Sequence, residues 1–232
     1  MIQTAHRLNS VQEYYFSKKL REVRQLVAEG KPIINMGIGS PDLAPDASVI
    51  QAMVQGMNDA KAHEYQSYQG LPELRQGMAD FYTKQFGVTL NPNTEILPLM
   101  GSKEGIMHIS LAFLNEGDEV LIPDNAYGPN KAMTASLLAQ FGVRHALYDP
   151  LDPDDLAQRI TPATRLVWLE APGSVTLEFP DLRALVALCR ARGVTTALDN
   201  TWGAGLAFRP FDLMGDGSGS LAVDVSAHAL TK

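Results

Sequence analysis

A lysine closes residues 226–232, a segment that begins with small and apolar side chains. An amine held away from water loses its charge more readily and then acts as a nucleophile that forms an imine with a carbonyl group. Taken alone, such a lysine is more often solvated, and His228 is more often a packed neighbour than a catalyst. Lys232 is therefore a candidate only if other functional groups meet it.

A carboxylate stands at the end of a second apolar run. Asp199 directly follows residues 194–198, which are all apolar or small. A carboxylate at such a position is partly buried, so it needs a cationic or hydrogen-bonding partner. The alternative role for Asp199 is the N-cap of a following helix.

Residues 101–105, Gly-Ser-Lys-Glu-Gly, are a candidate phosphate-binding segment. Glycine lets a phosphate approach the backbone, and the free N–H groups of a first helical turn favour an anion. An ordinary turn between a strand and a helix can have the same sequence. Tyr127 follows another apolar run, where its ring could stack on a planar ligand or simply pack on the sheet.

Together these groups match the needs of one cofactor, pyridoxal phosphate. It requires a phosphate cup, an aromatic ring that stacks, a carboxylate that keeps the pyridine nitrogen protonated, and a lysine that forms the imine. Residues 101–105, Tyr127, Asp199 and Lys232 supply one group each.

These residues meet only if the chain between them forms a parallel sheet. The predicted strands are residues 95–100, 119–123, 143–148, 165–170, 194–199 and 222–227. The predicted helices are residues 11–29, 46–60, 72–86, 102–115, 129–141, 153–160 and 181–192. Strands that alternate with helices indicate right-handed βαβ units, in which ligands bind at the carboxyl ends of the strands.

The composition narrows the class of protein. Lys and Arg number 19 against 26 for Asp and Glu, and this net charge of −7 argues against nucleic acid or an anionic membrane as the partner. Cys189 is the single cysteine, which excludes an intramolecular disulfide and Cys-rich metal sites. Because no apolar run approaches the roughly 18 residues of a membrane span and no secretory signal opens the sequence, we expect a cytoplasmic protein.

The sequence resembles the fold-type I pyridoxal-phosphate enzymes, with a different subfamily in each half. Residues 1 to about 120 resemble a class I/II aminotransferase, through residues 34–42, 65–75 and 101–105. From about residue 118 the chain resembles cystathionine β-lyase and its Cys/Met-metabolism relatives. The segments that carry this second resemblance are residues 124–129, 169–178, 198–202 and 224–232.

The resemblance implies an α/β fold with three layers, α-β-α, around a mainly parallel sheet. It implies an N-terminal helix and arm over residues 1–40 and a cofactor-binding large domain over residues 41–232. In both subfamilies the chain continues past the lysine into a small C-terminal domain, so this sequence is expected to be a truncated large domain. A homodimer with the active site at its interface is also implied.

The resemblance also implies a role for individual residues. Lys232 would form the imine and later move the proton of the substrate's α-carbon, Asp199 would pair with the pyridine nitrogen, and Tyr127 would stack on the ring. Tyr65 would reach the phosphate in the neighbouring subunit, and Gly37 would lie near the substrate carboxylate. The phosphate would be held by Gly101, Ser102, the backbone of Lys103 and the hydroxyl of Thr231.

Three functions follow from this pattern. We favour C–S bond cleavage of the cystathionine β-lyase type, giving homocysteine, pyruvate and ammonia, because the second half holds most cofactor contacts. Residues 171–174, Ala-Pro-Gly-Ser, also stand where aminotransferases carry an Asn-Pro motif. The first alternative is an aminotransferase that moves an amino group between an amino acid and a 2-oxo acid. The second is an inactive fragment that only binds the cofactor.

Overall fold

The computed structural model describes residues 5–6, 13–37, 42–203 and 206–230. The chain forms two compact units, residues 1–63 and residues 64–232. The boundary at residue 40 that the family resemblance implies, between an N-terminal arm and the cofactor-binding domain, is a different kind of division and stays a prediction.

The first unit contains two helices, α1 (Tyr15–Ala28) and α2 (Ala47–Met57). Helix α2 begins where the Asp46 carboxylate accepts the N–H of Ser48 at 2.8 Å, a side-chain N-cap. Neither helix buries a residue in the described part of the chain. Both predicted helices are confirmed with shorter bounds.

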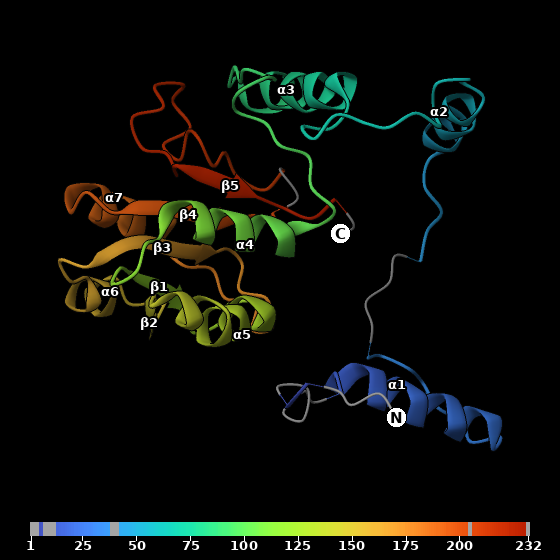
Figure 1. Cartoon of the computed structure of the whole chain (residues 1–232), viewed down its shortest axis with the longest axis horizontal. Coiled ribbons are helices and arrows are strands. Elements are labelled where there is room, and N and C mark those ends of the chain that lie inside the picture. Colours follow the sequence, from blue (N-terminus) through green and yellow to red (C-terminus); the bar gives the residue numbers. More distant parts are fainter. Residues whose placement is uncertain (1–4, 7–12, 38–41, 204–205, 231–232) are drawn as a thin grey trace. The chain divides into compact units, whose positions relative to one another are not determined.

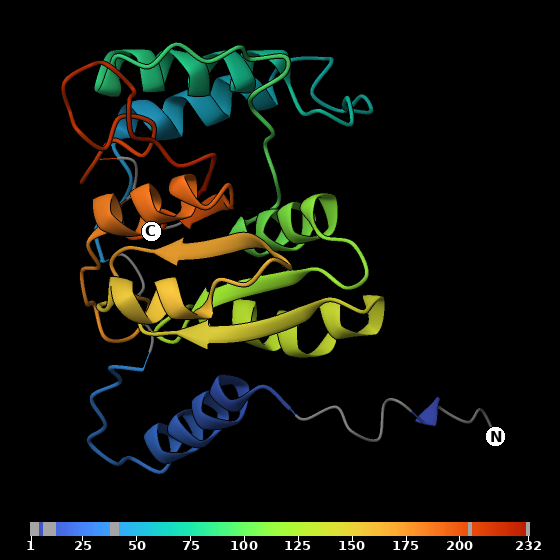
Figure 2. The ribbon, with the colours of Figure 1, turned by 90° about the vertical axis from the view of Figure 1, so that its left-hand side faces the viewer.

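The second unit is built on a parallel sheet of five strands in the order β2-β1-β3-β4-β5. All four neighbouring pairs run parallel, and Figure 2 shows arrows that point the same way. The strands are β1 (Glu119–Pro123), β2 (Arg144–Tyr148), β3 (Thr164–Glu170), β4 (Thr195–Asp199) and β5 (Val225–Ala227). The predicted α/β class with a mainly parallel sheet is confirmed.

Helices cover both faces of this sheet, which makes the three expected layers (Figure 1). α4 and α5 lie on one face, and α6 and α7 lie on the other. The helices of the second unit are α3 (Pro72–Phe86), α4 (Ser102–Phe113), α5 (Gly128–Ser136), the 3-10 helix η2 (Leu138–Phe141), α6 (Pro153–Arg159) and α7 (Leu182–Ala191).

The strands supply a core to each face because their side chains alternate. In β3, Leu166 and Trp168 point into the cluster under α4 and α5, whereas Val167 and Leu169 point into the cluster under α6 and α7. All four are buried, as expected for a strand with helices on both faces. The Trp168 indole N–H also donates to Ser110 Oγ at 3.2 Å, which fixes α4 on its face of the sheet.

Two predicted strands differ from the structure. Residues 95–100 are not a strand, because no strand of the described chain runs beside them to complete a ladder. β5 begins at Val225 rather than at residue 222, since the Val223 N–H donates to the Pro210 carbonyl instead of to β4. Both outcomes depend on partners that are distant in sequence.

Candidate active site

The carboxyl ends of three neighbouring strands lie in register at one edge of the sheet. Glu170, Asp199 and Ala227 end β3, β4 and β5 and are paired across the ladder. This is the edge at which parallel α/β sheets bind ligands. The structure therefore places Asp199 where the sequence predicts it.

Asp199 is buried with few partners for its charge. One carboxylate oxygen accepts the N–H of Thr201 at 3.0 Å. Burial raises the pKa of Asp199, while the hydrogen bonds from Thr201 and the nearby His228 oppose that rise. A buried carboxylate in this state favours a cationic hydrogen-bond donor such as a protonated ring nitrogen.

A second buried carboxyl group, which the sequence reasoning did not select, stands beside Asp199. Glu170 Oε2 accepts the backbone N–H of Tyr127 at 2.7 Å. Burial raises the pKa of Glu170 to about 8, helped by the charge of Asp199 and opposed by the Tyr127 N–H and by Lys131. Its position at the end of a predicted strand, as for Asp199, is the signal that could have identified it.

Tyr127, which follows the end of β1, and Lys103, in the first turn of α4, come together. Tyr127 is half-buried and immediately precedes α5, with a Pro in the first turn of that helix. The Lys103 Nζ lies 5.4 Å from the centre of the Tyr127 ring, within the range of a cation–π contact. The predicted phosphate segment and the predicted stacking ring therefore meet at this edge.

The segment of residues 101–105 has the backbone that an anion site needs. Gly101 precedes α4 with a φ of +142°, a conformation that L side chains rarely adopt. Gly105 lets α4 approach its neighbours closely, since a Cβ there would lie 2.9 Å from Leu99 Cδ1 and 3.8 Å from Ala227 Cβ. In the first turn of α4 the Glu104 N–H donates to the Gly101 carbonyl at 3.2 Å. The N–H groups of Ser102 and Lys103 precede it, and at the start of a helix such groups, with the helix dipole, favour an anion.

Thr201 ties the chain after β5 to the end of β4. Its hydroxyl oxygen accepts the N–H of Ala229 at 3.0 Å, and the Asn200 N–H donates to the Ala227 carbonyl at 2.7 Å. His228 in the same segment is half-buried, and burial lowers its pKa while Asp199 opposes the change. These contacts direct the segment that leads to Thr231 and Lys232, two predicted site residues that lie outside the described residues.

Tyr65 and Gly37 are not brought to this sheet edge by any described contact. Tyr65 is fully exposed in the loop before α3. Gly37 lies in the first unit, where its N–H donates to Asn35 Oδ1 at 3.0 Å. Their expected roles toward a partner's phosphate and the substrate carboxylate stay predictions.

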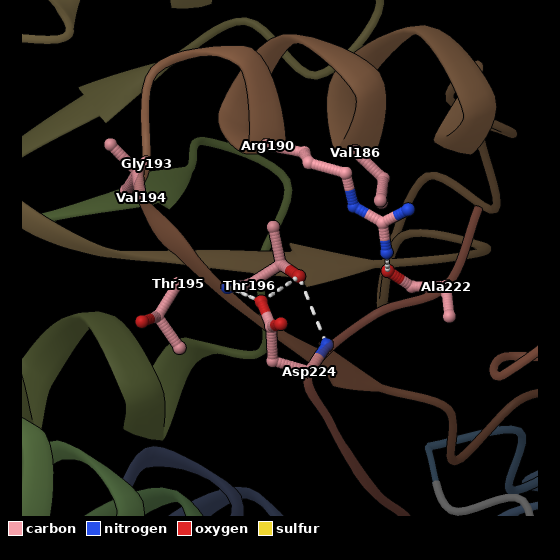
Figure 3. Close-up of a pocket in the computed structure, with 8 residues that line it drawn as sticks. All are labelled: Val186, Arg190, Gly193, Val194, Thr195, Thr196, Ala222 and Asp224. Atoms are coloured by element: carbon pink, nitrogen blue, oxygen red, sulfur yellow. Dashed lines mark hydrogen bonds between the residues drawn. The ribbon is translucent and has the colours of Figure 1, made fainter. Parts of the chain in front are cut away.

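Two cavities lie near these elements. The larger, of about 890 Å³, lies between α3, α4 and the end of β5, and Gly101, Ser102 and His228 are in its wall. The smaller, of about 200 Å³, lies beside Thr195 and Thr196, at the start of β4 (Figure 3). Because Asp199 ends that strand, the smaller cavity belongs to the opposite edge of the sheet from the candidate site.

The smaller cavity is lined by groups that already bond one another. Asp224 Oδ2 accepts the N–H of Thr196 at 2.7 Å and its hydroxyl at 2.8 Å (Figure 3). Arg190 donates to the carbonyls of Ser220 and Ala222. These bonds fasten the start of β5 to β4 and α7.

The sheet, its helices and the residues at its carboxyl edge define a fold-type I pyridoxal-phosphate architecture. The family model for Cys/Met metabolism PLP-dependent enzymes matches residues 100–232. The chain belongs to this family, whose cofactor is pyridoxal 5′-phosphate.

Curated relatives with similar sequences are aminotransferases. The LL-diaminopimelate aminotransferase of Aquifex aeolicus is 31% identical over 245 residues, which cover 100% of this chain and 62% of the relative. The enzyme of the same name from Natranaerobius thermophilus is 42% identical over 154 residues, 66% of this chain and 39% of the relative. The chain thus spans about two fifths to three fifths of these relatives.

Solved structures agree on the fold. BacF from Bacillus subtilis superposes with a TM-score of 0.74 at 22% identity, over 100% of this chain and 60% of that one. The N-succinyldiaminopimelate aminotransferase of Mycobacterium tuberculosis has a TM-score of 0.72 at 23% identity, over 86% of this chain and 52% of that one.

Within the described residues, no helix is both long and apolar enough to cross a membrane.

Proposed function

We propose that the chain forms the cofactor-binding part of an aminotransferase. The buried Asp199 carboxylate carries this proposal, because it lies at the same sheet edge as the N-terminus of α4 and the segment that leads to Lys232. The names of the relatives favour amino-group transfer over the C–S bond cleavage that the sequence analysis ranked first. The family model over residues 100–232 keeps C–S cleavage as the second candidate.

The residues at the sheet edge fit pyridoxal phosphate. Gly101, Ser102 and the backbone of Lys103 would hold its phosphate at the start of α4, together with the Thr231 hydroxyl. Asp199 suits the ring nitrogen, because a buried carboxylate with one backbone partner gains from a cationic donor. When bound, the cofactor withdraws electrons from the α-carbon of the amino acid and so weakens the bonds to that carbon.

The residues of the chain itself have separate roles in this proposal. Lys232 holds the cofactor through its amine and moves the proton at the substrate's α-carbon. Asp199 would keep the ring nitrogen protonated, and Tyr127 would orient the ring. Thr201 holds the segment before Lys232 through the Ala229 N–H and also donates its own N–H to Asp199.

The relatives also suggest a substrate class and an assembly. We propose an amino acid of the LL-diaminopimelate type as donor and a 2-oxo acid as acceptor, by analogy with the names of the relatives. A cytoplasmic homodimer is part of the same proposal, since the fully exposed Tyr65 ring has room for a neighbouring subunit.

The first experiment is the visible absorption spectrum after addition of pyridoxal phosphate, for the chain and for Lys232→Ala. The expected result is a visible band that the variant lacks. If both proteins give the same spectrum, the lysine does not hold the cofactor and the proposal fails.

The reaction type is decided by product stoichiometry. An aminotransferase consumes one equivalent of LL-diaminopimelate per site and stops until 2-oxoglutarate is added. A C–S lyase instead releases pyruvate continuously from cystathionine with no oxo acid present. Continuous pyruvate release would contradict amino-group transfer and support the second candidate.

A further inference from the structure

Glu170 joins two strand ends that are distant in sequence. Its side chain lies at the end of β3, and its Oε2 accepts the N–H of Tyr127, 43 residues earlier, at 2.7 Å. Glu170 itself is 4% exposed. A buried carboxyl group in this place is costly, so the contact that it makes needs a reason.

The contact acts at Tyr127, whose ring centre lies 5.4 Å from the Lys103 Nζ. Tyr127 is the last residue before α5, with φ −48° and ψ 122°, and no side chain caps that helix at Tyr127. The hydrogen bond that the Tyr127 N–H donates to Glu170 therefore holds the backbone at the point where the chain turns into the helix. The direction of the Cα–Cβ bond of Tyr127, and with it the place of the ring, depends on that backbone.

We propose that Glu170 is a positioning residue that fixes the Tyr127 ring for the cofactor by accepting the Tyr127 N–H. This inference rests on the proposed function for its consequence, because the ring is useful only if pyridoxal phosphate binds at this edge. The hydrogen bond itself is a property of the protein without cofactor.

The surrounding charges indicate which form of Glu170 makes the contact. Asp199 is its register partner on β4, and the Asp199 charge raises the pKa of Glu170, as does burial. The Tyr127 N–H and Lys131 lower it, with a net value of about 8. Burial raises the pKa of Asp199 as well, and the hydrogen bonds from Thr201 and the nearby His228 oppose that rise.

With a pKa of about 8, Glu170 is mostly neutral near pH 7 and adds no second negative charge beside Asp199. A protonated ring nitrogen would pair with Asp199 in its ionised form. A glutamine at position 170 would keep the same acceptor oxygen and the same neutrality, whereas a methionine would keep the volume and remove the acceptor.

The experiment compares Glu170→Gln and Glu170→Met, with Glu119→Gln as the matched control. Glu119 also accepts side-chain hydrogen bonds in this sheet, from Thr161 and Thr164, but it lies at the opposite end of the strands. Two quantities are measured for each protein: amide hydrogen exchange at Tyr127 without cofactor, and the affinity for pyridoxal phosphate by quenching of tryptophan fluorescence.

The expected result separates the variants. Glu170→Met speeds exchange at Tyr127 and weakens cofactor affinity, each by about tenfold, as expected for a lost hydrogen bond to a buried acid. Glu170→Gln and the control stay within about threefold of the wild type in both. Equal affinity in wild type and Glu170→Met would overturn the positioning role.

The two proposals can fail separately. If wild type does not bind pyridoxal phosphate, the proposed function fails while exchange at Tyr127 still reports the contact. If Glu170→Met does not fold, the contact is tested in the wild-type protein by measuring the chemical shift of the Tyr127 amide as a function of pH. That shift must change together with the side-chain carboxyl resonance of Glu170 as this group titrates, expected near pH 8. A Tyr127 shift that stays constant while the Glu170 carboxyl titrates overturns the inference.

Discussion

The ammonium group of Lys103 lies 5.4 Å from the centre of the Tyr127 ring, so the first turn of α4 and the chain after β1 meet at the sheet edge. The two segments are adjacent because α4 packs on β3 and on α5, the helix that Tyr127 precedes. This contact brings a cation to the expected place of a phosphate and an aromatic face to the expected place of a planar ring.

Removal of the Tyr127 ring should weaken cofactor binding. We expect Tyr127→Ala to lower the affinity for pyridoxal phosphate by about threefold to tenfold, the usual worth of an aromatic contact. Tyr127→Phe should bind nearly as wild type, because stacking uses the ring and not the hydroxyl. Fluorescence titration measures both, and equal affinity in all three proteins would show that Tyr127 does not stack.

The buried acid Glu170 should make stability fall as the pH rises. Below its ordinary pKa of 4.5 the carboxyl is protonated in the folded and the unfolded chain. Between 4.5 and about 8 the unfolded chain releases the proton while the folded chain keeps it. The free energy of unfolding therefore decreases across this window and levels off above it.

Urea unfolding at several pH values measures that slope. Glu170→Gln should flatten it, because an amide does not titrate. The raised pKa of Asp199 and the lowered pKa of His228 persist in the variant, so the difference between the two curves isolates Glu170. Parallel curves would mean that Glu170 is ionised in the folded protein.

A side chain at position 101 should strain the turn before α4. The φ of +142° at Gly101 is rarely adopted by L residues, and we expect Gly101→Ala to cost about 1–3 kcal/mol of stability. Gly128→Ala is the matched control, since that position is in α5, lacks such a φ, and has open space for a Cβ. Thermal unfolding of both variants is the measurement, and equal melting temperatures would contradict the strain.

The bonds of Asp224 should hold β5 in the sheet. Asp224 accepts both the N–H and the hydroxyl of Thr196 (Figure 3). Asp224→Ala leaves the Thr196 N–H without this acceptor, and we expect a loss of about 1–3 kcal/mol. Hydrogen exchange should accelerate first in β5. Asp216→Ala is the control, because Asp216 is exposed and its carboxylate accepts the N–H of the nearby Ser218. A similar loss there would refute a specific role for Asp224.

The alternation of apolar runs and helical spacing was enough to predict most of the fold. A strand that is buried on both faces consists mostly of apolar residues, and residues 165–170 fit this pattern. The pattern is local, so it can be recognised without knowing the rest of the chain. Asp199, Tyr127 and Gly101 could be selected for the same reason. Each follows a recognisable apolar run. Parallel strands place the carboxyl ends before Asp199 and Tyr127 at one edge, whereas the run before Gly101 is not a strand in the structure.

Pairing across the sheet, by contrast, was decided only by the tertiary structure. Residues 95–100 have the composition of a strand but no neighbouring strand in the described chain, and β5 is shortened where Val223 bonds Pro210. The bond between Glu170 and Tyr127 likewise joins residues 43 positions apart. Hydrophobic periodicity reports which face of an element is buried, whereas the identity of the atoms across that face depends on how distant segments pack.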